Sequence, residues 1–144
     1  MLGFIRKRGE ATMRALATTL KLASTVFVMV AGLHLIYGLG ADAMLGAVVS
    51  PETMIEPSLN SQNRFYGVSF SFYGVALYLC ASDIERYEPI LKALLYVFFL
   101  AGAARIVSWA TLGAPTLPII ALLATELLLP PALLIWLRKA KNEA

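Results

Sequence analysis

ILKALLYVFFLAGAARIVSWA, residues 90–110, is the stretch of sequence that decides the fold of this chain. Lys92 and Arg105 are its charged residues, and every other long side chain in it is apolar or aromatic. With a rise of about 1.5 Å per residue, a helix over this stretch is roughly 30 Å long, which matches the apolar thickness of a bilayer. We therefore predict that residues 90–110 form a transmembrane helix.

Three further stretches have the same apolar character: residues 22–39, 64–81 and 117–137. The whole sequence is 59% hydrophobic and 15% charged, with a mean hydropathy of +0.74. Soluble domains are about 45–50% apolar and about 25% charged, so a water-soluble domain of this size could not bury so much apolar surface. We predict an all-α membrane protein of four transmembrane helices. The short connections after the second and third stretches favour an antiparallel bundle.

Small residues on the second stretch predict where two of these helices touch. Gly67, Ser71 and Gly74 are spaced by four and three positions, so they share one face of a helix. Small side chains let two backbones approach closely in lipid, where apolar burial gives little driving force. This face is expected to contact another helix of the same chain.

The basic residues indicate how the chain crosses the membrane. If the four helices cross in alternation, ten of the twelve Lys and Arg residues lie on one side: five before residue 22, two beside the turn at 82–88, and three after residue 137. Basic residues favour the cytoplasmic side, so both chain ends are predicted to be cytoplasmic. The positions of the basic residues thus argue against reading the net charge of +3 as a sign of nucleic-acid binding, and no nucleic-acid partner is predicted.

This topology divides the chain into three parts. Residues 1–21 are expected to form a basic lead-in in the cytoplasm or at the membrane surface. Residues 22–137 form a single four-helix membrane domain, and residues 138–144 form a basic cytoplasmic tail. The first loop, residues 40–63, is expected on the opposite side of the membrane, with a short surface helix at residues 43–49.

Four ionisable residues fall within or at the edge of the predicted spans: His34, Arg64, Arg105 and Glu126. Ionisable groups in a membrane are costly and are functional candidates for that reason. Arg105 cannot become neutral, so it needs an acceptor, and Glu126 is the carboxylate predicted within reach on the next helix. We predict an ion pair between Arg105 and Glu126, with His34 against the same carboxylate.

Other polar residues share the depth of these four, on the side away from the chain ends. The predicted cluster consists of His34, Tyr37, Asn63, Arg64, Tyr66, Arg105, Ser108 and Glu126. The opposite half of the spans is filled with Leu, Val, Phe and Ile, so the cluster predicts a polar pocket that opens toward the outside. A cluster of this kind either binds a ligand or simply locks helices together, and the residues alone leave both interpretations open.

The composition excludes several kinds of site. Cys80 is the single cysteine, so the chain has no internal disulfide and no cysteine metal site. His34 is the single histidine, which excludes a bis-histidine haem, and no metal-ligand spacing is present. No lysine occupies the middle of a span, which excludes a retinal-type Schiff base. No cofactor is predicted, but acid–base chemistry by His34 and Glu126 stays an alternative.

Short motifs at the helix ends resemble those of a known family. They are LHLIYG at residues 33–38, NRFYG at 63–67, RIVSW at 105–109 and GAP at 113–115, followed by Glu126 and Pro130. Together they resemble an uncharacterised family of small four-helix bacterial membrane proteins, similar to the DoxX-like group. The resemblance implies a multi-pass protein of the bacterial inner membrane. It also implies that the recurring polar positions are His34, Asn63, Arg64, Arg105 and Glu126.

The sequence thus supports several functions. The leading hypothesis is a membrane protein whose outward-facing polar pocket binds a small amphipathic ligand, a quinone or a lipid, or that serves as an accessory subunit of a membrane complex. The alternatives are a small membrane enzyme that uses His34 and Glu126, and an oligomeric transporter. The predicted partners are membrane lipid and either another membrane protein or further copies of the chain.

Overall fold

The computed structural model describes residues 2–143, together with the side chains of residues 9–143. Within that range the chain is helical and has no strand. The four long helices are α1 (Leu2–Tyr37), α4 (Pro57–Ser82), α5 (Glu88–Leu112) and α6 (Leu117–Glu143). Each is long and apolar enough to cross a membrane, which confirms the prediction of an all-α protein with four such helices.

The helices are longer than the predicted spans. α1 begins at Leu2, so the basic lead-in and the first apolar stretch form one continuous helix. α4 begins at Pro57, which needs no hydrogen-bond partner in the first turn because proline has no N–H. Glu56 caps this end: its carboxylate accepts hydrogen bonds from the backbone N–H groups of Ser58 and Leu59, at 3.1 and 2.5 Å.

Two short helices occupy the first loop: α2 (Leu39–Met44) and α3 (Pro51–Met54). The prediction of a helix at residues 43–49 was wrong, because the helix in this part of the loop, α2, begins at Leu39 and ends at Met44. α2 ends where Gly46 adopts a φ of 100°, a left-handed conformation that glycine accepts without strain. Beyond α2 the chain is irregular until Ser50 caps α3 by accepting a hydrogen bond from the Thr53 N–H.

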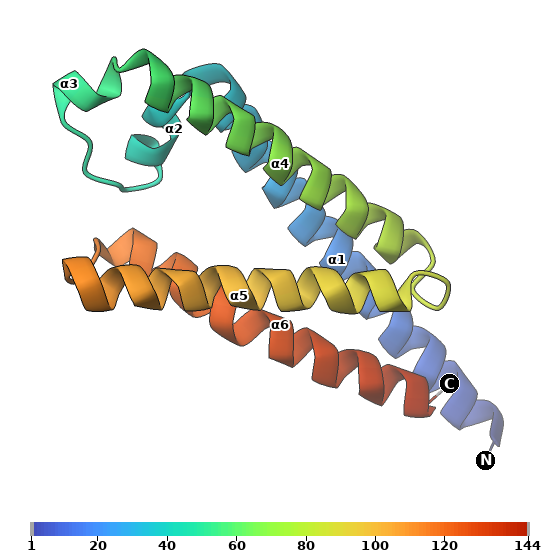
Figure 1. Ribbon diagram of the computed structural model, residues 1–144. Helices are drawn as coiled ribbons and strands as arrows, with labels where there is room; N and C mark the ends of the chain where they lie inside the picture. Colours follow the sequence, from blue (N-terminus) through green and yellow to red (C-terminus); the bar gives the residue numbers. More distant parts are fainter. Residues whose placement is uncertain (1, 144) are drawn as a thin grey trace.

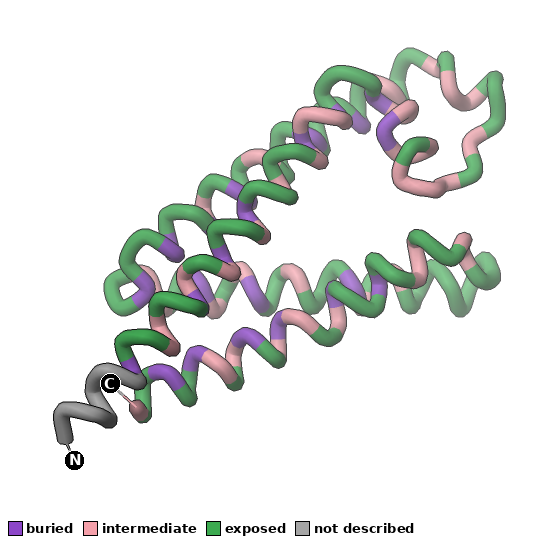
Figure 2. Tube along the Cα trace, turned by 180° about the vertical axis from the view of Figure 1, so that it is seen from behind, coloured by how far each residue is buried: buried purple, intermediate pink, exposed green. Residues whose placement is uncertain are grey.

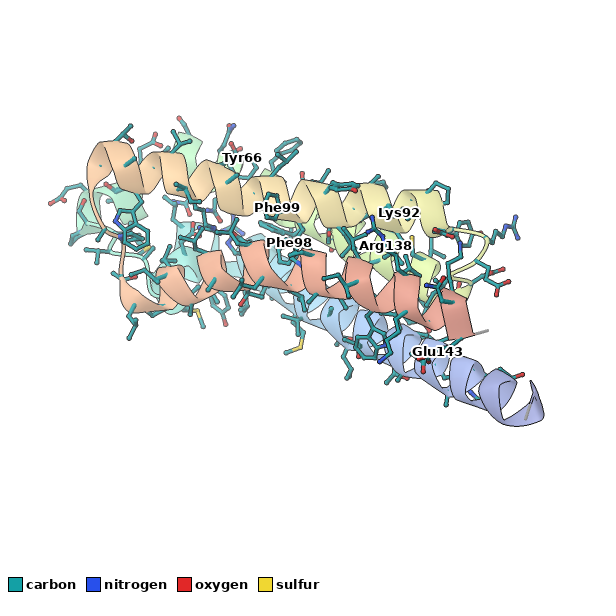
Figure 3. The ribbon with its side chains drawn as sticks, turned by 90° about the horizontal axis from the view of Figure 1, so that it is seen from below. Tyr66, Lys92, Phe98, Phe99, Arg138 and Glu143 are labelled. Atoms are coloured by element: carbon teal, nitrogen blue, oxygen red, sulfur yellow. The ribbon has the colours of Figure 1, made fainter. Side chains whose placement is uncertain are left out.

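The long helices form two pairs, α1 with α4 and α5 with α6 (Figure 1). The pairs meet at one end of the molecule, near the α4–α5 turn, and spread apart toward α2 and α3. We call these the closed end and the open end. The first turns of α1 and the last turns of α6 both lie at the closed end, where the Thr12 hydroxyl donates to the Glu143 carboxylate at 3.0 Å. Lys92 and Arg138 also lie toward this end (Figure 3).

Glycines set the spacing within each pair. A Cβ at Gly67 would lie 3.0 Å from the Cβ of His34, and one at Gly74 would lie 2.9 Å from a methyl group of Val28. Those distances leave no room for a side chain, so the two glycines let α4 approach α1 closely. The predicted contact of the Gly67/Ser71/Gly74 face with another helix is therefore confirmed at both glycines. The buried Ser24 hydroxyl also donates to the Gly74 carbonyl at 2.8 Å.

The apolar core fills the closed end. All four long helices contribute to it, and Figure 2 shows buried positions recurring along their inner faces. Its fully buried members with less than 2% exposure are Leu16, Leu20, Cys80, Leu91 and Leu137. Because this core stops partway along the molecule, the two pairs are free to diverge beyond it.

Candidate functional site

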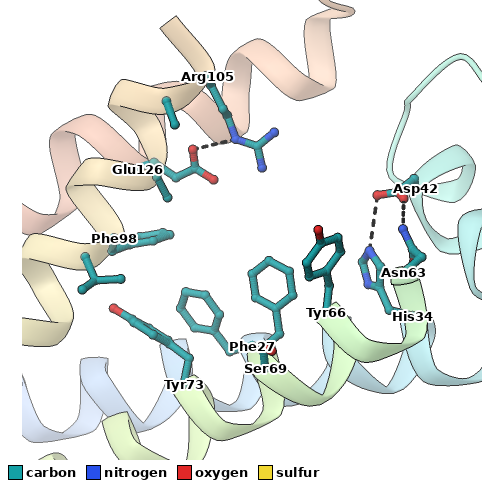
Figure 4. Close-up of a pocket in the computed structure, with 14 residues that line it drawn as sticks. Phe27, His34, Asp42, Asn63, Tyr66, Ser69, Tyr73, Phe98, Arg105 and Glu126 are labelled. Atoms are coloured by element: carbon teal, nitrogen blue, oxygen red, sulfur yellow. Dashed lines mark hydrogen bonds and ion pairs between the residues drawn. The ribbon is translucent and has the colours of Figure 1, made fainter. Parts of the chain in front are cut away.

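A cleft of about 820 Å³ lies between the two helix pairs, on the open side of the core. Small-molecule sites usually measure about 300–1,000 Å³, so the cleft has the size of a ligand pocket. Its walls carry polar groups and its floor is aromatic (Figure 4). The lining residues are Phe27, His34, Asp42, Asn63, Tyr66, Ser69, Phe70, Tyr73, Val97, Phe98, Ala101, Ala104, Arg105 and Glu126.

Three aromatic rings close the floor of the cleft. The ring centroid of Phe27 lies 4.6 Å from that of Tyr73 and 5.3 Å from that of Phe98. The Tyr73 hydroxyl crosses from α4 to α5 and donates to the Leu94 carbonyl at 2.8 Å. Aromatic rings at such distances pack favourably, and the hydrogen bond holds the two pairs together at this level. The floor therefore separates the cleft from the core and gives an apolar group a surface to lie on.

The α5–α6 wall carries the predicted ion pair. Arg105 Nε donates to Glu126 Oε2 at 2.7 Å, and the Glu126 side chain is buried. Gly102 makes this possible, because a Cβ there would lie 2.9 Å from the Cβ of Glu126. The two terminal guanidinium nitrogens of Arg105 point into the cleft and have no hydrogen bond within residues 9–143 (Figure 4). They are free to donate to a ligand.

The α1–α4 wall carries a second polar cluster, which consists of His34, Asp42 and Asn63. His34 Nε2 lies 3.3 Å from Asp42 Oδ1, and the Asn63 amide donates to Asp42 Oδ2. The prediction that His34 lies against Glu126 was therefore wrong, since its carboxylate partner is Asp42. The chain reverses at Gly38, where φ is 57°, and this turn brings α2 back beside the end of α1.

One hydrogen bond of this cluster shows which ring nitrogen of His34 carries a hydrogen. His34 Nδ1 is 2.8 Å from the Val30 carbonyl, which can only accept, so Nδ1 carries a hydrogen. His34 Nε2 then lies beside one carboxylate oxygen of Asp42, and the Asn63 amide donates to the other.

Asn63 has a buried acceptor without a partner. The residue is 8% exposed, and its Oδ1 has no hydrogen-bond partner within the part of the chain that the structure describes. The orientation of the amide is set by Asp42, because a flipped amide would bring oxygen against a carboxylate oxygen. A buried acceptor without a partner costs about 1–3 kcal/mol, so the contact between the Asn63 amide and Asp42 is made at that cost.

The structure brings five of the eight predicted site residues together along the cleft: His34, Asn63, Tyr66, Arg105 and Glu126. The other three predicted residues lie outside it.

Of those three, Arg64 caps the end of α1 by donating to the carbonyls of Leu35 and Ile36, the second at 3.0 Å. Tyr37 and Ser108 are exposed and do not line the cleft.

Asp42 is the functional candidate that the sequence reasoning missed. It lies in the first loop, where a carboxylate is normally solvated. The one signal in the sequence is its place a few residues after Gly38, the glycine that follows α1, which indicates a turn but not the direction of that turn. Among the described residues, no group of three or more His, Cys, Asp or Glu side chains could hold a metal ion.

Comparison with known proteins places the chain in a family. No curated protein and no solved structure gives a significant match. The sequence profile of one family, described as "Domain of unknown function (DUF4345)", matches residues 15–137, which include the residues that line the cleft and most of each long helix. This confirms the likeness to an uncharacterised family that the motifs implied. The chain therefore belongs to the family of the domain of unknown function DUF4345.

Proposed function

We propose that this protein binds a small amphipathic molecule, a lipid or a quinone-like compound, in the cleft at its open end. The observation that carries the proposal is the division of the cleft into an aromatic floor and two polar walls. An amphipathic molecule matches that division, with its apolar part on Phe27 and Phe98 and its polar head between Arg105 and Asn63.

The way the helix pairs meet supports entry from the lipid. The two pairs contact each other mainly through α1 and α6, and α4 touches α5 far less. The cleft therefore opens sideways between α4 and α5, where Tyr66 and Ala101 border it. A molecule dissolved in the bilayer reaches the aromatic floor through this opening without crossing water.

The proposed topology is an antiparallel bundle in the bacterial inner membrane, with both chain ends in the cytoplasm. Basic residues near the closed end support it, since Lys92 and Arg138 lie there (Figure 3). The open end then faces the outside of the cytoplasmic membrane. Reporter fusions test this topology: a fusion after Ala144 should be inactive as alkaline phosphatase, and activity would contradict the proposal.

Native mass spectrometry after mild extraction tests the binding itself. The wild-type protein should carry a bound amphiphile, and Ala101→Trp should remove it, because Ala101 lines the cleft and a large ring would fill it. The matched control is Leu100→Trp, since Leu100 is 63% exposed and does not line the cleft. Loss of the adduct in both variants, or in neither, would contradict the proposal.

The same experiment separates the other hypotheses. An accessory subunit or an oligomeric transporter should leave the membrane with a protein partner or further copies of the chain, rather than with a bound lipid. The enzyme hypothesis paired His34 with Glu126, but His34 contacts Asp42 on the wall opposite Glu126 (Figure 4). Direct proton exchange between His34 and Glu126 therefore has no support from the geometry.

A further inference from the structure

We infer that the polar head of the ligand presents acceptor oxygens, as in a carboxylate or an ester carbonyl, and that Arg105 selects for them. This inference rests on the proposed function and names the class of molecule that the same cleft would take. It follows from hydrogen-bond donors that lie on both of the helices beside the opening of the cleft, α4 and α5.

The first donor is the guanidinium of Arg105 on α5. Glu126 holds its Nε at 2.7 Å, whereas its terminal nitrogens point into the cleft and have no hydrogen bond within residues 9–143 (Figure 4). The Arg105 side chain is 38% exposed and that of Glu126 is 9% exposed, so a molecule in the cleft meets the guanidinium rather than the carboxylate. A guanidinium only donates, and its planar fork matches the oxygens of a carboxyl group.

The second donor is the hydroxyl of Tyr66 on α4, the other helix beside the opening. Tyr66 is 49% exposed and lines the cleft. Its oxygen accepts a hydrogen bond from the Gln62 amide at 3.3 Å, and its own hydrogen has no acceptor among the residues that the structure describes. The head of a molecule that enters between α4 and α5 therefore meets a free donor on each of these helices.

The acceptors of the α1–α4 wall are less available than these donors. Both carboxylate oxygens of Asp42 already contact nitrogen atoms, one on His34 and one on Asn63. Asn63 Oδ1 is buried, so a molecule in the cleft does not reach it.

This difference between donors and acceptors selects the head of the ligand. A head with acceptor oxygens pairs the terminal nitrogens of Arg105 when it displaces water from them. A head that only donates, such as an ammonium group, would leave those nitrogens without a partner, which is costly. It would also bring a cation against the guanidinium. The chain of either molecule could lie on the same aromatic floor, so the head decides between them.

The test compares three probes that share one monounsaturated chain: oleate with a carboxylate, methyl oleate with a neutral carbonyl, and oleylamine with an ammonium. Native mass spectrometry of the full-length protein in an uncharged detergent, at mildly alkaline pH, measures the bound fraction of each. Both acceptor probes should bind about tenfold more tightly than oleylamine. Tighter binding of oleate would identify an anionic head, and tighter binding of methyl oleate a neutral carbonyl. Either order supports the inference.

Four variants connect this preference to the residue. Arg105→Met combined with Glu126→Leu removes the guanidinium without leaving a buried carboxylate unpaired, and it should abolish the advantage of the acceptor probes over oleylamine. Glu126→Leu alone keeps the guanidinium and should retain that advantage. Tyr66→Phe should reduce it by a smaller factor, because a neutral donor forms a weaker hydrogen bond than a charged one. The matched control is Arg86→Met, an exposed arginine of the α4–α5 turn outside the cleft, which should leave the advantage unchanged.

The outcomes separate this inference from the proposed function. Equal or tighter binding of oleylamine to the wild-type protein would overturn the inference, and so would an advantage of the acceptor probes that survives in the double variant. The proposed function would still stand if the wild-type protein carries an amphiphile that Ala101→Trp removes. Absence of all three probes and of any other bound amphiphile would overturn both.

Discussion

The closed end and the open end of this molecule are built from the same four helices, yet they differ in what lies between the helix pairs. At the closed end, Leu20 and Leu91 are buried side chains of one continuous core. At the open end the pairs separate around a cleft that buries ionisable groups in its walls. Apolar packing joins the pairs at one end, and polar groups line the space between them at the other.

The polar groups of the open end do not draw the two walls together, and this explains why the cleft stays open. Each wall satisfies its charges within its own pair of helices: Arg105 binds Glu126 on one side, and His34 contacts Asp42 on the other. The walls are joined instead at the floor, where Tyr73 donates to the Leu94 carbonyl, and at the loop, where the Thr116 hydroxyl donates to the Gly46 carbonyl at 2.7 Å. A lock between helix pairs would place opposite charges on opposite walls, which is not the arrangement found here.

The largest effect is expected from truncation of the closed-end core. Leu20 is 0% exposed, so Leu20→Ala should lower the free energy of unfolding by about 2–5 kcal/mol through lost contacts and a cavity. Val97→Ala in the cleft wall should cost less than about 1 kcal/mol, because Val97 is already 56% exposed. Denaturant titration in mild detergent measures both. Equal losses would show that the cleft is packed in solution and that the comparison between the two ends is wrong.

An intermediate effect is expected from the ion pair. Glu126→Leu should lower the free energy of unfolding by about 1–3 kcal/mol, because it leaves Arg105 without its carboxylate. This loss is smaller than that expected for a fully buried pair, because the Arg105 side chain is 38% exposed. Arg105→Met with Glu126→Leu should cost less than the sum of the two single changes, with a coupling energy of about 1–2 kcal/mol. A double-mutant cycle measures this coupling. Strict additivity would argue against an energetic pair at the open end.

The smallest effect is expected at the start of α4. Hydrogen bonds from the backbone N–H groups of Leu59 and Ser58 hold the pKa of Glu56 below its ordinary value. Because the pKa is lowered in the folded state, this stabilisation is present at neutral pH and is lost as the pH falls through the lowered pKa. The protection factor of the Leu59 amide, which corrects the exchange rate for its intrinsic pH dependence, should therefore fall on acidification. Glu56→Ala should show a low protection factor already at neutral pH, whereas Glu85→Ala at the other end of the molecule should behave as wild type.

The sequence predicted the helices well and the Arg105–Glu126 pair correctly, for physical reasons that are local. Apolar length identifies a helix that can cross a membrane, and a guanidinium that cannot become neutral requires a carboxylate within reach. Glu126 lay on the next helix, connected by a short turn, so the partner could be identified without knowledge of the tertiary structure.

The rest of the site depended on the path of a loop. Asp42 reaches His34 because the chain turns at Gly38 with a positive φ, and the direction of such a turn cannot be deduced from the presence of glycine alone. Arg64 was placed in the cluster by depth, but it donates to the carbonyls at the end of α1 instead. The aromatic floor was missed because Phe27 and Phe98 are ordinary apolar residues until two helix pairs diverge above them.

Photocrosslinking with an amphipathic lipid that carries a diazirine on one acyl chain tests the central claim most directly, because it reports where the ligand lies. After irradiation of the full-length protein in nanodiscs, peptide mass spectrometry should find the label on the cleft residues Tyr73 and Phe98, and an excess of the same lipid without the diazirine should remove it. Label spread over the exposed residues Phe72 and Val107, outside the cleft and unaffected by competitor, would contradict a binding site between the helix pairs.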